Sequence, residues 1–353
     1  MNTDAHAPML SADALSDLAR AALRSFGLGE ADAAQAARVL VLAEMFGLRT
    51  HGVARILEYG ERLSVGGVAS APQIRVERVA PALARVDGAN GVGPLVGMTA
   101  LEAAMEGARE QGVGVAFARG GNHFGPVAPY NFLAAEAGFA SIIGSNATTT
   151  IAPWGGKDAR LGNSPVGFGV PNPGGRPIIL DMAISVAARA KIRRVAEQGA
   201  PIPEGWPTDA DGRPTTDAAA ALGGFLLPIG GHKGYGLALI VDLFAGLLSG
   251  AAYLTHVKSW QDNPDEPQNL GHFFILIDAA RLGTADWLAA RMADFAAILH
   301  DAPPADPAQP ILLPGEIEMR AYDKARREGV TLDARLYERL RERVALGSAG
   351  PKE

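Results

Sequence analysis

From residue 74 the sequence reads IRVERV (74–79) and ALARVD (82–87), then a helical stretch over 96–110, then GVGVAFARG (112–120). Short segments in which apolar residues alternate with polar or small ones are typical of β-strands, whereas the stretch between them has helical length and spacing. FASIIGSN (139–146) and HFFILID (272–278) predict two further strands. The centre of the chain is therefore predicted to be α/β, with a strand order that the sequence leaves open.

Helical patterns lie on both sides of this centre. Apolar residues recur at close to 3.6 positions from 10 to 23, with Ser11 placed to cap the first turn, and further helices are expected over 30–46 and 52–63. The spacer GGVASAP (66–72) marks a boundary. Helical spacing returns over 284–299, 318–329 and 332–346. A helix over 234–248 is apolar almost all round and is predicted to be buried.

These patterns predict a mixed α/β chain of the α+β type. A helical domain over residues 1–72, completed by 317–353, is expected beside a central α/β domain over 73–316. The composition fits a globular protein of 353 residues, with 48% hydrophobic and 20% charged residues.

Charge and cysteine content exclude several classes of function. The net charge of −6 gives no basic surface for nucleic acid or for an anionic membrane. The sequence has no Cys, which excludes disulfide frameworks, Cys-ligated metals and cysteine nucleophiles. No secretory signal and no apolar stretch of about 18 residues is visible, so a cytoplasmic protein without a membrane span is expected.

Familiar nucleotide and hydrolase fingerprints are missing. A Rossmann domain needs G-x-G-x-x-G directly after a strand, but residues 88–93 have the reversed spacing and 112–114 lack the third glycine. The Walker loop, G-x-S-x-G and H-E-x-x-H are also absent. Fold arguments alone therefore assign no function to this chain.

The segment Thr50-His51-Gly52-Val53-Ala54-Arg55 concentrates polar groups between two predicted helices. Imidazole titrates near neutrality, so His51 suits proton transfer to a reacting oxygen, and Thr50 could orient it. If Gly52 opens a helix, His51 and Arg55 lie four positions apart on one face, where the guanidinium could bind a carboxylate with two hydrogen bonds. The alternative is structural: His51 caps the helix and Arg55 forms a surface ion pair.

Two loop segments carry further polar candidates. In residues 121–130 a glycine-flanked His123 follows an apolar strand, which would allow close approach to a ligand, although a single loop histidine is often structural. Residues 152–173 are rich in Gly and Pro and present Asn163 and Ser164. This second segment is either a shaped binding loop or an elaborate surface loop.

Two segments resemble helix starts that bind anions. Asp181 and Ser185 stand where a strand meets a helix, so they either cap that helix or lie beside a bound phosphate. Residues 228–236 combine glycines with the basic pair His232 and Lys233 before an apolar helix. That combination suits an anion site, or else a plain glycine-rich turn.

Six blocks in this order resemble the malate/L-lactate dehydrogenase family of NAD(P)-dependent oxidoreductases. They are THGVAR (50–55), NHFGPVAPY (122–130), APWGGKDARLGNSP (152–165), LDMAIS (180–185), IPEGW (202–206) with DADGRPTTD (209–217), and GGHKGYGLALIVDLFAG (230–246). The resemblance runs from about residue 10 to 340. It implies a fold unrelated to Rossmann, a cofactor-binding central domain, and a homodimer with its active site between the helical and central domains.

The resemblance also implies roles for individual residues. His51 would be the acid/base, oriented by Thr50, which stands where the family has Ser, and Arg55 would bind the substrate carboxylate. Asn163 falls where the family offers a Thr hydroxyl to the substrate, and Arg189 falls where a substrate contact is expected and could favour a second anionic group. The segments that match cofactor contacts contain His123, Asp181, Met182, Ala183, His232, Lys233, Gly234, Pro314 and Gly315.

The function implied is hydride transfer between NAD or NADP and C2 of a small 2-hydroxy or 2-oxo carboxylic acid. A reductase of cyclic imino acids (piperideine- or pyrroline-2-carboxylate) is the nearest alternative in chemistry. A non-catalytic nucleotide-binding protein is an alternative from another class. A metal-dependent hydrolase using His51 and His123 is disfavoured, because no carboxylates stand at ligand spacing, and no metal site is expected.

Overall fold

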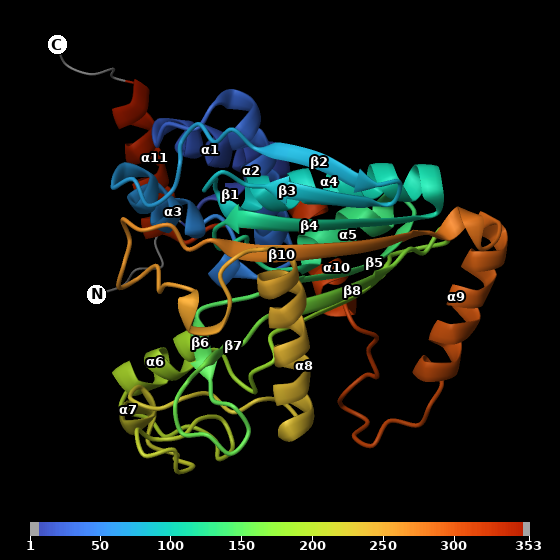
Figure 1. Ribbon diagram of the computed structural model, residues 1–353. Helices are drawn as coiled ribbons and strands as arrows, with labels where there is room; N and C mark the ends of the chain where they lie inside the picture. Colours follow the sequence, from blue (N-terminus) through green and yellow to red (C-terminus); the bar gives the residue numbers. More distant parts are fainter. Residues whose placement is uncertain (1–6, 349–353) are drawn as a thin grey trace.

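The computed structural model describes residues 7–348 and has a mixed sheet at its centre (Figure 1). Seven strands lie in the order β2-β3-β4-β10-β5-β8-β9, and only the β3–β4 pairing is parallel. The strands are β2 (Arg75–Ala80), β3 (Leu83–Asp87), β4 (Val113–Gly121), β5 (Phe139–Ser145), β8 (Val166–Val170), β9 (Ile178–Met182) and β10 (Leu270–Asp278). The prediction of a mixed α/β chain is confirmed.

Two pairs of short strands lie outside this sheet. They are β1 (Met9–Leu10) with β11 (Val330–Thr331), and β6 (Thr149–Ile151) with β7 (Leu161–Gly162). The strand β8 lies within a stretch that the sequence indicated only as a loop.

Helices cover the two faces of the sheet unequally. Along β10, Phe274 and Leu276 pack with α4 (Gly93–Gln111) and α5 (Ala128–Glu136), whereas Phe273 faces α8 (His232–Asp242). This alternation is the period of two that a strand buried on both faces requires. The remaining helices of this part are α6 (Arg189–Glu197), α7 (Ala218–Ala221) and α9 (Ala285–His300).

A separate hydrophobic core joins the two ends of the chain. Leu15 of α1 (Ala12–Ser25), Leu40 of α2 (Glu30–Met45) and Ile56 of α3 (Arg55–Ser64) share it with residues of α10 (Glu316–Glu328) and α11 (Ala334–Ser348). Figure 1 shows α11 beside α1. The active-site candidates lie where this helical layer meets the sheet.

The helix predicted over 234–248 differs from expectation. It begins at His232 and continues after Asp242 as a π-helix, η2 (Leu243–Leu248), and it is not buried all round, so that prediction is wrong. Only one side packs on the sheet, which leaves Ile240, Leu247 and Leu248 51%, 48% and 59% exposed. No helix of the described chain has the length and hydropathy of a membrane span.

Candidate active site

His51 lies on a tight turn between α2 and α3. Residues Arg49–His51 form a 3-10 helix, η1, and α3 begins only at Arg55. The expectation that Gly52 opens a helix is therefore wrong, because the backbone of Gly52 is extended there. The Oγ1 atom of Thr50 lies 3.0 Å from Nδ1 of His51, so the threonine fixes one ring nitrogen and leaves Nε2 for other partners.

Glu44 is a buried residue that the sequence did not single out, and its side chain stabilises this turn through a hydrogen bond. Its Oε2 accepts a 3.1 Å hydrogen bond from the backbone N–H of Val53. A Cβ on Gly52 would lie only 2.1 Å from the same oxygen, so glycine is needed for this approach. Burial raises the pKa of Glu44, and the bond from Val53 and the charge of Arg49 oppose that shift.

Arg55 lies at the start of α3 with its guanidinium turned back over the turn. Its Nε donates to the carbonyl of Thr50 at 2.7 Å, and Nη1 pairs with Glu58. Among the residues that the structure describes, Nη2 has no hydrogen-bond partner, although the side chain is only 15% exposed. A partly desolvated guanidinium with a free terminal nitrogen can bind a carboxylate.

His123 follows β4 and joins the same cluster. Its ring centre lies 5.5 Å from that of His51, and its Nδ1 lies 2.8 Å from the hydroxyl of Tyr59 on α3. Trp260 stacks on His123 at 5.0 Å and lies 5.3 Å from the guanidinium of Arg55. The structure thus brings Thr50, His51, Arg55 and His123 together.

The two histidines are neutral at physiological pH. Burial, and then the charge of Arg55, lower the pKa of His51 to about 4. The same causes, in the same order, hold the pKa of His123 well below its usual value. A neutral imidazole can take a proton from a bound hydroxyl group.

A groove of about 180 Å³ adjoins this cluster. It is lined by Leu48, Ala128, Ile179, Leu180, Asp181, Pro314, Gly315 and Glu318. Leu48 directly precedes η1, and Ala128 lies five residues after His123, so groove and cluster share two segments. The carboxylate of Asp181 accepts from the N–H of Ala128 at 2.8 Å at the start of α5, and burial raises the pKa of Asp181 to about 6.

A second group of candidates lies where β9 ends. The N–H of Ile184 donates to the carbonyl of Asn163 at 2.8 Å, and the N–H of Ile229 donates to the carbonyl of Ile184 at 2.9 Å. These bonds bring Asn163 and the exposed Ala183 alongside the turn that starts α8. Met182, the half-buried last residue of β9, connects them with the groove.

No side chain caps the first turn of α8, and its N-cap Gly231 has a φ of +64°. His232 and Lys233 are exposed on that turn, and the ring of His232 contacts Trp154. A Cβ on Gly234 would lie 1.9 Å from the carbonyl oxygen of Ile229, so only glycine fits. Such a helix start suits an anionic group.

Arg189 is engaged elsewhere. Its guanidinium donates to the carbonyls of Leu222 and Gly224 at 2.5 and 3.1 Å, and so ties α6 to the end of α7. None of its hydrogen bonds joins it to His51 or Arg55.

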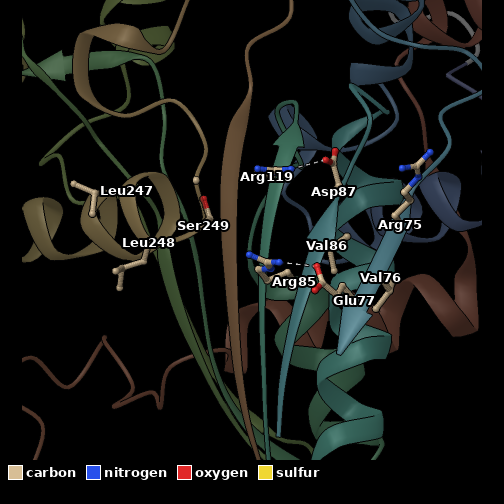
Figure 2. Close-up of a pocket in the computed structure, with 11 residues that line it drawn as sticks. Arg75, Val76, Glu77, Arg85, Val86, Asp87, Arg119, Leu247, Leu248 and Ser249 are labelled. Carbon is tan, nitrogen blue, oxygen red and sulfur yellow. Dashed lines mark hydrogen bonds and ion pairs between the residues drawn. The ribbon is translucent and has the colours of Figure 1, made fainter. Parts of the chain in front are cut away.

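A larger cavity of about 550 Å³ opens between β2, β3 and the end of η2, away from this site (Figure 2). Two of the three arginines that line it are paired with carboxylates, Arg119 with Asp87 at 2.9 Å and Arg85 with Glu77 at 2.7 Å. The lining contains no histidine, so this cavity lacks the proton-transfer group that the His51 cluster has. In the described part of the chain, no cluster of three or more metal-ligating side chains exists.

Three further residues of the cluster escaped the sequence analysis: Tyr59, Arg62 and Trp260. Tyr59 follows Arg55 by four positions on one helix, a spacing that could have indicated its place. Trp260 comes from a loop with no motif, and only the three-dimensional structure brings it to the site.

A neutral histidine, a partly buried arginine with a free guanidinium nitrogen and an adjoining groove thus lie together at this site. The model of the malate/L-lactate dehydrogenase family matches residues 10–341. The chain belongs to this family. It is a dehydrogenase of 2-hydroxy acids that transfers hydride with NAD(P).

Known relatives cover almost the whole chain. L-sulfolactate dehydrogenase of Methanocaldococcus jannaschii is 37% identical over 320 residues, 91% of this chain and 92% of that protein. Delta(1)-pyrroline-2-carboxylate reductase of Ancylobacter novellus is 36% identical over 334 residues, 94% and 96% of the two chains. The solved structure of the M. jannaschii sulfolactate dehydrogenase has a TM-score of 0.88 at 35% identity, covering 97% of this chain and 98% of that one.

Replacement of Glu44 tests how the His51 turn is held. Glu44→Ala should lower the free energy of unfolding by about 1–3 kcal/mol relative to Glu44→Gln, since only glutamine keeps an acceptor for the buried N–H of Val53. Burial raises the pKa of Glu44 above the ordinary 4.5, so the folded protein favours the protonated carboxyl. The wild type therefore gains stability from this group below about pH 4.5 and loses it as the pH rises through the folded-state pKa. The free energy of unfolding of Glu44→Gln, measured by urea denaturation, should therefore rise relative to that of the wild type as the pH is raised from 4 to 8.

Glu61→Ala, at an exposed glutamate of α3, is the matched control and should change stability little. Equal losses for Glu44→Ala and Glu61→Ala would contradict the role of Glu44.

Proposed function

We propose that His51 moves the proton and Arg55 holds the substrate carboxylate in reversible hydride transfer at C2 of a 2-hydroxy acid. The observation that carries this proposal is the neutral His51 beside a guanidinium whose Nη2 is free. In oxidation, Nε2 of His51 accepts the hydroxyl proton while Nδ1 donates to Thr50. In reduction the protonated ring returns it to the carbonyl oxygen.

Substrate binding adjusts the acid/base group. The charge of Arg55 helps to keep His51 neutral, so a carboxylate bound to Arg55 removes part of that effect and raises the pKa of His51. The imidazole thereby becomes a better base once substrate is present.

NAD(P) fits the groove and the start of α8. When bound, the nicotinamide supplies or accepts the hydride. We assign binding of the cofactor to the segments with His123, Asp181, Met182, Ala183, Pro314 and Gly315, and the phosphates to the uncapped turn with His232, Lys233 and Gly234. The choice between NAD and NADP stays open, although the relative from Chromohalobacter salexigens is named as an NADP(+) enzyme.

Substrate contacts by Asn163 and Arg189 remain predictions. Asn163 holds Ile184 through its backbone, which leaves its side-chain amide for a ligand. Arg189 retains only part of its donor capacity after binding two carbonyls.

The proposed domain division follows the hydrophobic cores. A helical domain over 1–72 with 317–353 is supported by the core that α1–α3 share with α10 and α11. The cofactor domain over 73–316 would then be non-Rossmann, in keeping with a sheet that has a single parallel pairing. A cytoplasmic location is likewise a proposal.

Reduction of a cyclic imino acid is the second candidate. It needs the same carboxylate ligand and proton donor, with the proton ending on nitrogen, and the A. novellus relative is named for this activity.

His51→Ala tests the function directly. The substitution should lower kcat by at least ~100-fold with the preferred substrate, because it removes the acid/base group, while NADH or NADPH still binds. The assay follows reduced-nicotinamide absorbance with pyruvate, oxaloacetate, 2-oxoglutarate, sulfopyruvate, diketogulonate and the two cyclic imino acids.

His256→Ala, at an exposed histidine, is the control and should retain activity. Unchanged turnover in His51→Ala would exclude the assignment. Cofactor binding without turnover by the wild type would support a non-catalytic protein instead.

The pH profile of oxidation should show the low pKa of His51. In the free enzyme, kcat/KM should stay level from pH 8 down to pH 5.5, because the ring loses its basic form only near pH 4. The inflection in kcat should lie at higher pH than that in kcat/KM, since the bound carboxylate offsets Arg55. A kcat/KM inflection at pH 6.5 would show an unperturbed histidine.

A homodimer is also part of the proposal. The exposed apolar side chains Ile240, Leu243, Leu247 and Leu248 form one side of α8 and η2, which a second copy could cover. Leu248→Glu should then convert the dimer to a monomer in light scattering, whereas Leu282→Glu, at an equally exposed leucine, should not. The same mass for wild type and Leu248→Glu would place the contact elsewhere.

A further inference from the structure

Few cations near His51 are free to bind a second anionic group. Arg62 on α3 is 3% exposed, and its N–H groups meet five oxygens. These belong to Asn122, Gln268 and the carbonyls of Gly67, Pro264 and Glu266. A guanidinium has five N–H donors, so none remains for a ligand.

The other cations are committed or solvated. Lys258 pairs with Glu266. Arg189 is held between α6 and the end of α7 by two carbonyls, and none of its hydrogen bonds joins it to His51 or Arg55, so its remaining donors are not placed beside Trp260. Arg49 is exposed, so an anion bound there would gain little from a pairing in water. Arg55, with its free Nη2, is the one partly buried cation of the cluster that can accept a carboxylate.

Trp260 forms an apolar wall beside Arg55. Its indole lies 5.3 Å from the guanidinium of Arg55, 5.0 Å from the ring of His123 and 6.1 Å from that of Tyr59. A ligand held by Arg55 and reaching His51 therefore has an aromatic surface beside it. The indole presents aromatic carbon and a single neutral N–H, so it carries no charge that could pair with a second carboxylate or a sulfonate.

The loop that carries Trp260 is fastened at both ends. At its start, Asp242 accepts from the N–H of Leu254 at 3.1 Å, and Asn146 donates to the carbonyl of Ala252 at 2.6 Å. At its end, Arg62 holds the carbonyls of Pro264 and Glu266. Trp260 is thus a fixed wall of the site.

We propose that Trp260 determines specificity, and that the enzyme acts on substrates with one carboxylate and an uncharged carbon side chain. This inference rests on the proposed binding of the carboxylate by Arg55. A second carboxylate or a sulfonate would lose water beside the indole without gaining a cation. That cost falls on dianions such as oxaloacetate and sulfopyruvate, and spares pyruvate, 2-oxobutyrate and pyrroline-2-carboxylate.

The test compares kcat/KM for these five compounds. The kcat/KM of the best substrate with one carboxylate should be at least about tenfold higher than that of either dianion. Equal or greater kcat/KM for oxaloacetate or sulfopyruvate would overturn the inference while leaving the proposed function intact. Turnover of none of the five would overturn the inference. Absence of turnover across the full panel, 2-oxoglutarate and diketogulonate included, would overturn the proposed function as well.

Variants of Trp260 separate specificity from structure. Trp260→Lys should shift the ratio of kcat/KM by at least about tenfold toward oxaloacetate, mainly through a lower KM, because it supplies the missing cation. Trp260→Phe keeps the aromatic wall and should stay within about threefold of the wild-type ratio.

Trp287→Leu removes an exposed indole on α9 and is the control, with an unchanged ratio. A merely structural Trp260 would lower kcat/KM for all substrates alike in Trp260→Lys and leave the ratio unchanged. That result would contradict the proposal.

Discussion

The buried guanidinium of Arg62 is the contact on which the site depends. It joins α3, the end of β4 and the loop after η2, three segments far apart in the sequence. A buried cation without a carboxylate partner is costly unless each N–H is bonded, and here the five oxygens meet that need. Gln268 extends the network, since its Oε1 also lies 3.3 Å from the N–H of His123. The bonds of Arg62 thus position His123 through Gln268, and the loop of Trp260 through the carbonyls of Pro264 and Glu266.

Desolvation then sets the chemistry of the cluster. His51 and His123 are both held away from water, where the charged imidazole is disfavoured, and Trp260 stacks on His123. Arg55 adds to this effect and is itself the group that a substrate carboxylate would neutralise. With the proposed binding of the carboxylate by Arg55, the proton affinity of His51 would rise when substrate is bound, which favours proton transfer from substrate over protonation by solvent.

The sequence predicted the chemical groups better than their arrangement. Thr50, His51 and Arg55 were recognisable because they lie within six positions of one polar segment, and His123 because glycines flank it after a strand. The prediction of a helix from Gly52 was wrong. The side chain of Glu44 binds the N–H of Val53, and α3 begins only at Arg55. That bond spans nine residues and has no local pattern. Trp260 lies about 200 positions from Arg55, and periodicity carries no information over such a separation.

Glycines explain how this chain could bind a dinucleotide without the usual fingerprint. In a parallel sheet the glycines follow one strand, because the pyrophosphate meets the carboxyl end of that strand. In this mostly antiparallel sheet, the close approaches are divided between Gly315, with φ +88° beside Ile179, and the turn from Gly231 to Gly234. The carbonyl of Ile184 accepts from Ile229, and this bond connects the end of β9 with that turn. A phosphate-binding surface built this way leaves two short glycine signals some eighty residues apart, and neither is recognisable by itself.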